Sequence, residues 1–101
     1  PGDGLSFQKI SSERRFQDGM MHLVVEGEVR NETPEPQRIP YLAASALGAD
    51  GKIMQSWQIE PPAATLRPGE SVTFQSAVRS PPGTVAEINL SFAELPHDDK
   101  E

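Results

Sequence analysis

Apolar and polar residues alternate along several short stretches of this chain, and the alternation predicts β-strands. In the clearest stretch, residues 21–31, the positions of one parity are Leu23, Val25, Gly27 and Val29. The positions of the other parity are Val24, Glu26, Glu28 and Arg30. Successive side chains of a strand point to opposite faces, so the first set is predicted to face a core and the second set water. No stretch repeats apolar residues at the three-and-four spacing of an amphipathic helix.

Two further alternating stretches predict two more strands. Their core-facing residues are predicted to be Val72, Phe74, Ser76 and Val78 in one strand, and Ala86, Ile88, Leu90 and Phe92 in the other. Near the N-terminus, the run of Leu5, Phe7 and Ile10 breaks the alternation once, which is typical of an edge strand with a β-bulge. Gly27 lies on the core side of its strand, and its missing side chain predicts a bulky neighbour, for which Trp57 is the candidate.

Glycine and proline mark the turns. Asp50-Gly51 separates two strand-like runs and predicts a hairpin, because both positions of this dipeptide tolerate positive φ. In the second run, the predicted core-facing set is Ile53, Gln55, Trp57 and Ile59. In the first run, two sets compete, and we favour Leu42, Ala44 and Ala46 over Tyr41, Ala43 and Leu47. Pro68-Gly69 predicts a type II turn, and the other prolines fall almost wholly between the runs, where no ladder hydrogen bond is lost.

These elements predict an all-β fold, an immunoglobulin-like two-sheet antiparallel β-sandwich of about seven strands. The 101 residues suffice for one domain, with a folded core over residues 4–94 and an acidic tail over residues 95–101. The chain opens on Pro1, which favours a processed product or a fragment whose anchor or targeting segment lay upstream.

The chain also resembles a known family through a series of turn and core motifs. In the first half these are Leu23-x-Val25-x-Gly27-x-Val29-x-Asn31, Pro40-x-Leu42, Gly51-x-Ile53, Trp57 and Pro61-Pro62. In the second half they are Leu66-x-Pro68-Gly69-Glu70-Ser71, Phe74, Pro81-Pro82 and a closing strand to Phe92. Together they resemble the C-terminal domain of unknown function in proteobacterial proteins that begin with a zinc-ribbon finger and then cross the membrane once.

The resemblance covers about Leu5 to Glu94 and implies an immunoglobulin-like domain on the periplasmic side of an inner-membrane helix. It supplies no catalytic residues. The chain departs from the family pattern in the alanine-rich run from Ala43 to Ala46, where larger apolar residues are usual.

Composition narrows the possible partners. Fifteen acidic residues against nine basic ones give a net charge of −6, which disfavours nucleic acid and anionic membrane surfaces. There is no apolar stretch long enough to insert into a membrane. A protein partner of unidentified kind is expected, because sandwiches without pockets usually bind through a sheet face, end loops or an edge strand. The chain has no cysteine, which excludes disulfides, thiolate metal sites and a cysteine nucleophile.

Few residues are suited to metal chemistry. Met20, Met21 and His22 form a soft ligand set that could take Cu(I), and Met54 could join it if the strands are neighbours. The alternative is that the methionines fill gaps at a strand start and in the core, and we favour it. His22 is predicted on the solvent side of its strand, while His97-Asp98-Asp99 lies in the acidic tail without fixed geometry. No metal site and no cofactor are therefore assigned.

Catalysis is not expected. Glu26 and Glu28 share a face, but it is the predicted wet face, where Arg30 would counter their charge. The serines lack a nucleophile-elbow context and a base. We expect a non-catalytic extracytoplasmic interaction or scaffolding domain of a membrane-anchored bacterial protein, with the proline-rich loop from Thr33 to Pro40 as the first candidate contact surface. The alternative is a ligand- or metal-binding sensor domain.

Overall fold

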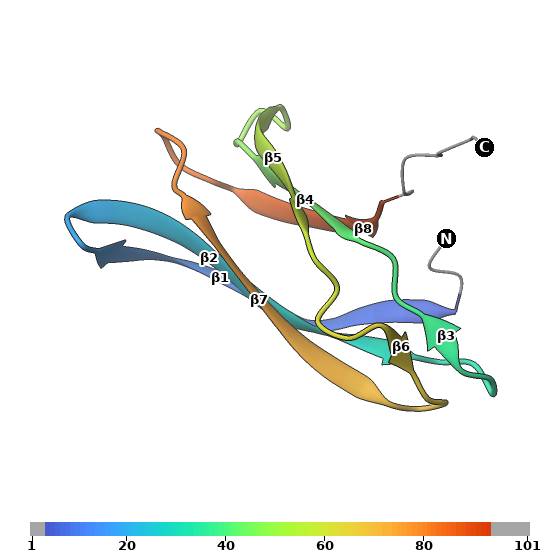
Figure 1. The fold of residues 1–101 in the computed structure, drawn as a ribbon. Coiled ribbons are helices and arrows are strands. Elements are labelled where there is room, and N and C mark those ends of the chain that lie inside the picture. Colours follow the sequence, from blue (N-terminus) through green and yellow to red (C-terminus); the bar gives the residue numbers. More distant parts are fainter. Residues whose placement is uncertain (1–3, 94–101) are drawn as a thin grey trace, which may run out of the picture.

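The computed structural model describes residues 4–93, and in this part of the chain every regular element is a β-strand (Figure 1). The strands are β1 (Leu5–Gln17), β2 (Met20–Asn31), β3 (Gln37–Arg38), β4 (Leu42–Leu47), β5 (Ile53–Ile59), β6 (Thr65–Leu66), β7 (Ser71–Arg79) and β8 (Glu87–Phe92). The predicted all-β class is confirmed, with eight strands where about seven were expected. Two of the eight are two-residue pieces, too short to produce an alternating pattern. Within residues 4–93 no helix has the length and apolarity to cross a membrane.

The strands form two facing antiparallel layers, a sandwich-like arrangement. One sheet has the order β1-β2-β7 and the other the order β5-β4-β8, while β3 and β6 pair separately at one end (Figure 1). The layers are linked on both sides. The rings of Phe7 and Phe92 stack with centroids 4.5 Å apart, and Trp57 Nε1 donates a 3.0 Å hydrogen bond to Ser76 Oγ.

The core lies where the alternation placed it. The buried set comprises Leu23, Val25, Val29, Ile39, Leu42, Ala44, Ala46, Ile59, Leu66 and Phe74. The ambiguous first arm of the Asp50-Gly51 hairpin therefore turns Leu42, Ala44 and Ala46 inward, as favoured. Small side chains are needed there because each alanine sits in the central strand β4, between β5 and β8, with the other sheet against it.

Gly27 has a different neighbour from the one predicted. It lies opposite Phe74 in the β2–β7 register, and a Cβ built on it would be 2.9 Å from Phe74 Cζ and still closer to Ile10 Cδ1. Trp57 was the wrong candidate because its ring is used at the β5–β7 side of the core, against Ser76. The glycine instead accommodates the β-bulge of β1, where Lys9 and Ile10 together lie opposite it.

A second bulge overturns the predicted orientation of Ile53. The β4–β5 register passes from Ala46↔Gln55 to Leu47↔Ile53, so Met54 is the extra residue. Parity changes there, and Ile53 joins Leu47 on the outer side of the sheet with 64% of its surface exposed. Ala86 was also assigned wrongly, because it is exposed and precedes β8.

Asp18-Gly19 and Asp50-Gly51 each close a hairpin, but only the first has the backbone geometry predicted for Asp50-Gly51. At Asp50-Gly51 only the glycine has positive φ, and Gly51 N–H donates to the carbonyl of Gly48. At Asp18-Gly19 both residues have positive φ, at 52° and 77°, which makes the two-residue turn between β1 and β2. β1 therefore continues to Gln17, well beyond the predicted run of Leu5, Phe7 and Ile10, and Asp18-Gly19 is the turn signal that marks its end.

Gly27→Ala should destabilise the fold. A methyl group in a strand ordinarily gains up to ~1 kcal/mol over glycine. Here it collides with the buried ring of Phe74, so we expect a net loss of about 1–3 kcal/mol in chemical denaturation. The double variant Ile10→Ala/Gly27→Ala removes the more flexible of the two obstacles and should recover part of the loss. A single variant as stable as the wild type would contradict the close packing.

Candidate functional site

The most exposed apolar surface lies at the end of the β1–β2 hairpin. We call residues 16–21 the hairpin tip. Phe16 is 69% exposed, Met20 39% and Met21 41%, and Phe16 lies directly opposite Met21 in the register. These are three of the five large apolar residues exposed in the described chain. The tip therefore concentrates apolar surface that the core does not cover.

The tip is exposed because the hairpin is longer than the layer that faces it. β1 and β2 have 13 and 12 residues, whereas β4 and β8 have six each. Leu23 is the last fully buried residue towards the tip, and the ribbon continues beyond the second sheet (Figure 1). Beyond Leu23, towards the tip, no sheet packs against either face of the hairpin.

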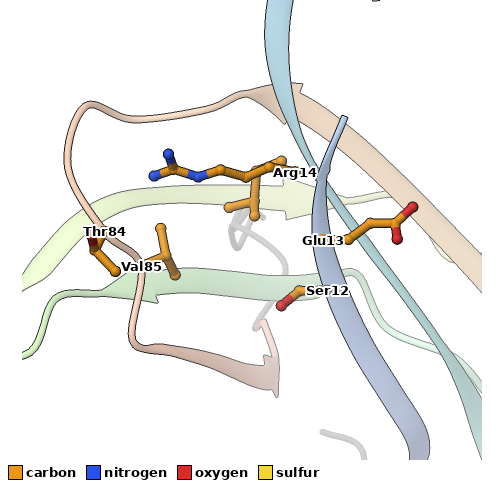
Figure 2. A pocket seen from close by; sticks show the side chains of 6 residues that line it. Ser12, Glu13, Arg14, Thr84 and Val85 are labelled. Atoms are coloured by element: carbon orange, nitrogen blue, oxygen red, sulfur yellow. The ribbon is translucent and has the colours of Figure 1, made fainter. Parts of the chain in front are cut away.

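A shallow, open cleft of about 320 Å³ lies at the base of this projection. It is bounded by β1 and by the connection from β7 to β8, and its lining residues are Ser12, Glu13, Arg14, Leu23, Thr84 and Val85. The Arg14 side chain spans the cleft, and its Nη2 donates to the carbonyl of Gly83. In Figure 2 it reaches toward the connection at Thr84, so it ties the hairpin to that connection.

The polar groups of the cleft do not converge as an acid–base site would require. Strand alternation turns Ser12 and Arg14 toward the cleft and Glu13 to the other side of β1 (Figure 2). On that side, the Glu13 carboxylate pairs with Arg15. Among the lining residues, Ser12 has an arginine on its side of β1 and no base, an arrangement that can bind a polar group but does not activate the hydroxyl.

The soft ligand set is divided by the same alternation. Met21 lies on the inner face opposite Phe16, whereas Met20 and His22 share the outer face. Met20 Sδ accepts a 3.4 Å contact from Arg79 Nη2, and His22 lies opposite Arg15 on one side and Arg79 on the other. Two guanidinium groups beside these donors oppose the binding of a cation.

Met54, the fourth possible ligand, belongs to the other layer. It is the bulge residue of β5, and its side chain lies beside Gly48 and Gly83, 3.4 Å from the position that a Cβ on either glycine would occupy. His22 itself is half-buried rather than fully solvated, and its Nδ1 is enclosed without a hydrogen-bond partner among residues 4–93. In the same residues there is no cluster of three histidine or carboxylate groups suited to a metal. His97, Asp98, Asp99 and the rest of the predicted tail lie outside the described residues.

The outer face of the β1-β2-β7 sheet carries the charges, but they pair differently from the prediction. Glu26 accepts from Gln75 Nε2 at 2.6 Å and lies 4.0 Å from Arg15, and Glu28 lies 3.8 Å from Lys9. Arg30, expected to counter these two carboxylates, instead pairs with Glu32 at 3.3 Å. The partners come from the neighbouring strands and from the end of β2, which a single-strand pattern does not reveal. Val24, on the same face, is buried at 3% exposure.

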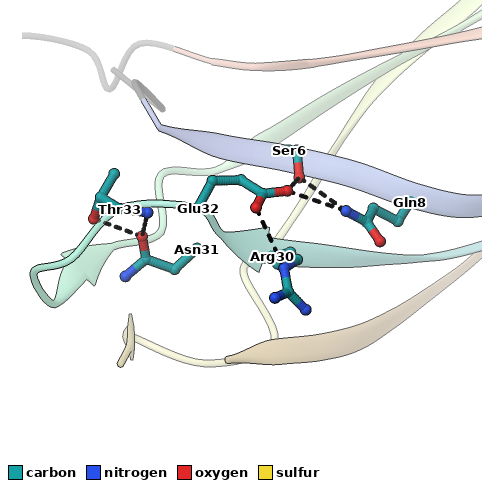
Figure 3. Close-up of polar contacts among 6 residues, drawn as sticks. All are labelled: Ser6, Gln8, Arg30, Asn31, Glu32 and Thr33. Carbon is teal, nitrogen blue, oxygen red and sulfur yellow. Dashed lines mark hydrogen bonds and ion pairs between the residues drawn. The ribbon is translucent and has the colours of Figure 1, made fainter. Parts of the chain in front are cut away.

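Glu32 and Asn31 organise the opposite end of the hairpin (Figure 3). The Glu32 carboxylate accepts from Ser6 Oγ at 2.8 Å and from Gln8 Nε2 at 3.1 Å. It thereby joins the start of β1 to the end of β2 on the surface, close to its ion pair with Arg30.

Asn31 is the one fully buried polar residue of the described chain, and its amide is saturated with hydrogen bonds. Its Nδ2 donates to the carbonyls of Glu35 and Leu66 at 2.8 and 3.0 Å. Its Oδ1 accepts from the N–H and the hydroxyl of Thr33 at 2.9 and 2.7 Å, which forms a local turn at the end of β2. The bond to Leu66 joins segments 35 residues apart, which no local signal indicates.

The loop from Thr33 to Pro40 is thus built into the fold. Ile39 is buried in the core and Thr33 is held by Asn31, whereas Pro34, Glu35 and Pro36 form an exposed tip. Its role as a contact surface stays a prediction. Deleting the whole loop would remove a core residue and the partners of the buried amide, so substitutions at its tip are the informative change.

Asn31→Ala should be strongly destabilising. The variant leaves the carbonyl of Leu66 buried without its donor and removes the acceptor of the Thr33 N–H. Each buried group that loses its partner costs about 1–3 kcal/mol. We expect a loss of about 2–4 kcal/mol in the free energy of unfolding, measured by chemical denaturation. Asn89→Ala, at an exposed position of β8, is the matched control and should change stability by less than about 0.5 kcal/mol. Equal stabilities of the two variants would show that the buried amide is dispensable.

Comparison of the chain with protein-family models, with curated proteins and with solved structures finds no match.

Proposed function

We propose that this domain is a non-catalytic extracytoplasmic interaction or scaffolding module of a membrane-anchored bacterial protein. The observation that supports the interaction role is the hairpin tip, where Phe16, Met20 and Met21 expose apolar surface on a projecting ribbon. The extracytoplasmic and membrane-anchored parts of the proposal rest on the family resemblance.

The tip has the composition of a binding epitope. Phenylalanine and methionine are enriched at protein interfaces, and apolar side chains gathered at one place mark contact sites more often than scattered ones. Polar and charged residues surround the apolar ones along the ribbon, among them Arg14, Arg15 and Asp18. A dry centre with a polar rim is the usual anatomy of an interface.

The shape of the site favours a protein partner over a small molecule. A small ligand needs a concavity that covers most of its surface, whereas the tip is convex and the neighbouring cleft is shallow and open. A convex ribbon can instead insert into a groove of another protein or present its edge to a strand.

Site-specific photo-crosslinking tests the interaction role. The full-length protein would carry a photoreactive aromatic residue in place of Phe16 and be expressed in its own host. We expect one discrete adduct, because the side chain sits at the centre of the proposed contact. The matched control places the same residue at Ile53, which is similarly exposed at the end of the β4–β5 hairpin. Absence of an adduct at Phe16, or the same adducts at both positions, would argue against the tip as the contact site.

Residues 1–101 contain no cysteine, so a cysteine introduced among them allows a direct test of location. The variant Gln17→Cys, in the exposed tip of the full-length protein, should react with a membrane-impermeant maleimide in spheroplasts. The expected result is that the variant is labelled before lysis and that the same protein without the substitution is not. Labelling only after lysis would place the domain on the cytoplasmic side and end the extracytoplasmic part of the proposal.

A further inference from the structure

The free edge of β7 differs from the other three edges of the two three-stranded sheets. β7 is a nine-residue edge strand that pairs with β2 without a register shift. From Ser71 to Val78 it contains no charged residue, no proline and no glycine. In a chain of which 24% is charged, this is a long neutral edge.

The other edges carry the devices by which natural sheets avoid pairing with another chain: charge, bulges and short length. β1 has a bulge at Lys9 and the charged run Glu13-Arg14-Arg15. β5 has the bulge at Met54, and β8 has six residues and begins with Glu87. Among the edges of the two three-stranded sheets in residues 4–93, only the β7 edge has none of these devices before its last residue, Arg79.

The backbone direction of β7 is set by the hydrogen bonds at its two ends. The carbonyl of Glu70 accepts from Asn31 N–H, and Ser80 N–H donates to the carbonyl of Met21. The backbone N–H and C=O groups of the even-numbered residues of β7 therefore point toward β2. Hydrogen-bonding direction alternates along a strand, so Thr73, Gln75 and Ala77 direct their N–H and C=O groups away from the sheet. The side chains of these three residues are exposed.

We propose that β7 pairs with β7 of a second copy of this chain, antiparallel about a two-fold axis at Gln75. In this register Thr73 lies opposite Ala77 of the second copy, and Val72 lies opposite Val78 of the second copy. No charged residue then faces one of like sign, because Arg79 lies opposite Ser71 of the second copy. The outward N–H and C=O groups of Thr73, Gln75 and Ala77 are satisfied across the axis, and two three-stranded sheets become one continuous sheet.

The second layer is compatible with this arrangement. A two-fold axis normal to the sheet keeps the β5-β4-β8 layers of both copies on the same side. The hydrogen bond from Trp57 to Ser76 places β5 on the β7 side of the sandwich, so the two β5 strands approach each other. β5 also contains no charged residue from Ile53 to Ile59, so no like charges meet there. A contact formed mainly by one strand pair is small, which predicts a weak, concentration-dependent dimer.

This inference deepens the proposed interaction role by naming a partner, and its biological meaning rests on that role. Sedimentation of the domain over a micromolar to millimolar series tests it. The wild type should shift from the monomer toward the dimer mass. Gln75→Lys and Gln75→Glu should each stay monomeric, because each places two like charges opposite one another at the axis. An equimolar mixture of the two variants should associate, since an ammonium group then faces a carboxylate across the axis.

Ser11→Lys is the matched control, because it adds the same charge at an exposed position on the opposite edge strand. It should dimerise like the wild type, and circular dichroism should show every variant folded. A monomeric wild type, a mixture that fails to associate, or a Ser11→Lys variant that is monomeric would each overturn self-pairing through β7. A monomeric wild type whose Phe16 still crosslinks to a partner would leave the proposed function standing.

Discussion

The buried amide of Asn31 is the interaction on which the arrangement of strands depends. Its backbone N–H and C=O bond Glu70 and Gly69, directly before β7, and its side chain bonds the segment before β3 and the carbonyl of Leu66 in β6. A two-residue pair such as β3–β6 is not stable alone, so the amide supplies the attachment that keeps it at the end of the sandwich. β7 begins directly after these backbone bonds and continues in a register against β2 that places Phe74 opposite Gly27, with its ring in the core.

The two ends of the β1–β2 hairpin are therefore unlike. At the Asn31 end, side-chain amides, a carboxylate and a type II turn with Gly69 at φ 76° satisfy the backbone and close the core. At the tip, the ribbon extends beyond the opposite layer, so its apolar side chains are exposed to water. In small β-domains, packed layers usually form a rigid scaffold that positions the exposed residues that make contacts. Here the packed layers are the scaffold, and the projecting tip holds the exposed residues.

Sequence periodicity was sufficient to predict most core residues, but not the orientation of residues near bulges in the edge strands. Leu23, Val25, Val29 and Phe74 follow simple alternation because each lies in a regular strand with a layer opposite. Ile53 fails because a bulge shifts parity by one residue, and the position of a bulge depends on pairing between strands rather than on either strand alone. The partner of Gly27 was missed for the same reason, since Phe74 lies far along the chain and is adjacent only through the register.

The candidate site was less accessible to sequence reasoning than the core. The Asp18-Gly19 turn was readable from the dipeptide, and reading it would have extended β1 to Gln17 and exposed Phe16. That the second layer stops short of the tip follows from the relative lengths of β8 and β1, which a pattern along one chain does not compare. The charge partners of Glu26 and Glu28 come from neighbouring strands, so they too required the sheet order.

The bulge at Lys9 and Ile10 has a mechanical consequence. Lys9 adopts φ 56°, and the ladder between β1 and β2 is interrupted there, opposite Gly27. Towards the tip, β2 stays paired with β7 as far as His22, and Leu23 and Val25 lie in the core, so on this side of the bulge only β1 can bend easily. The contact of Arg14 with Gly83 holds β1 to the connection between β7 and β8. A partner that displaces the hairpin tip therefore acts on residues outside the core, and the core can stay closed.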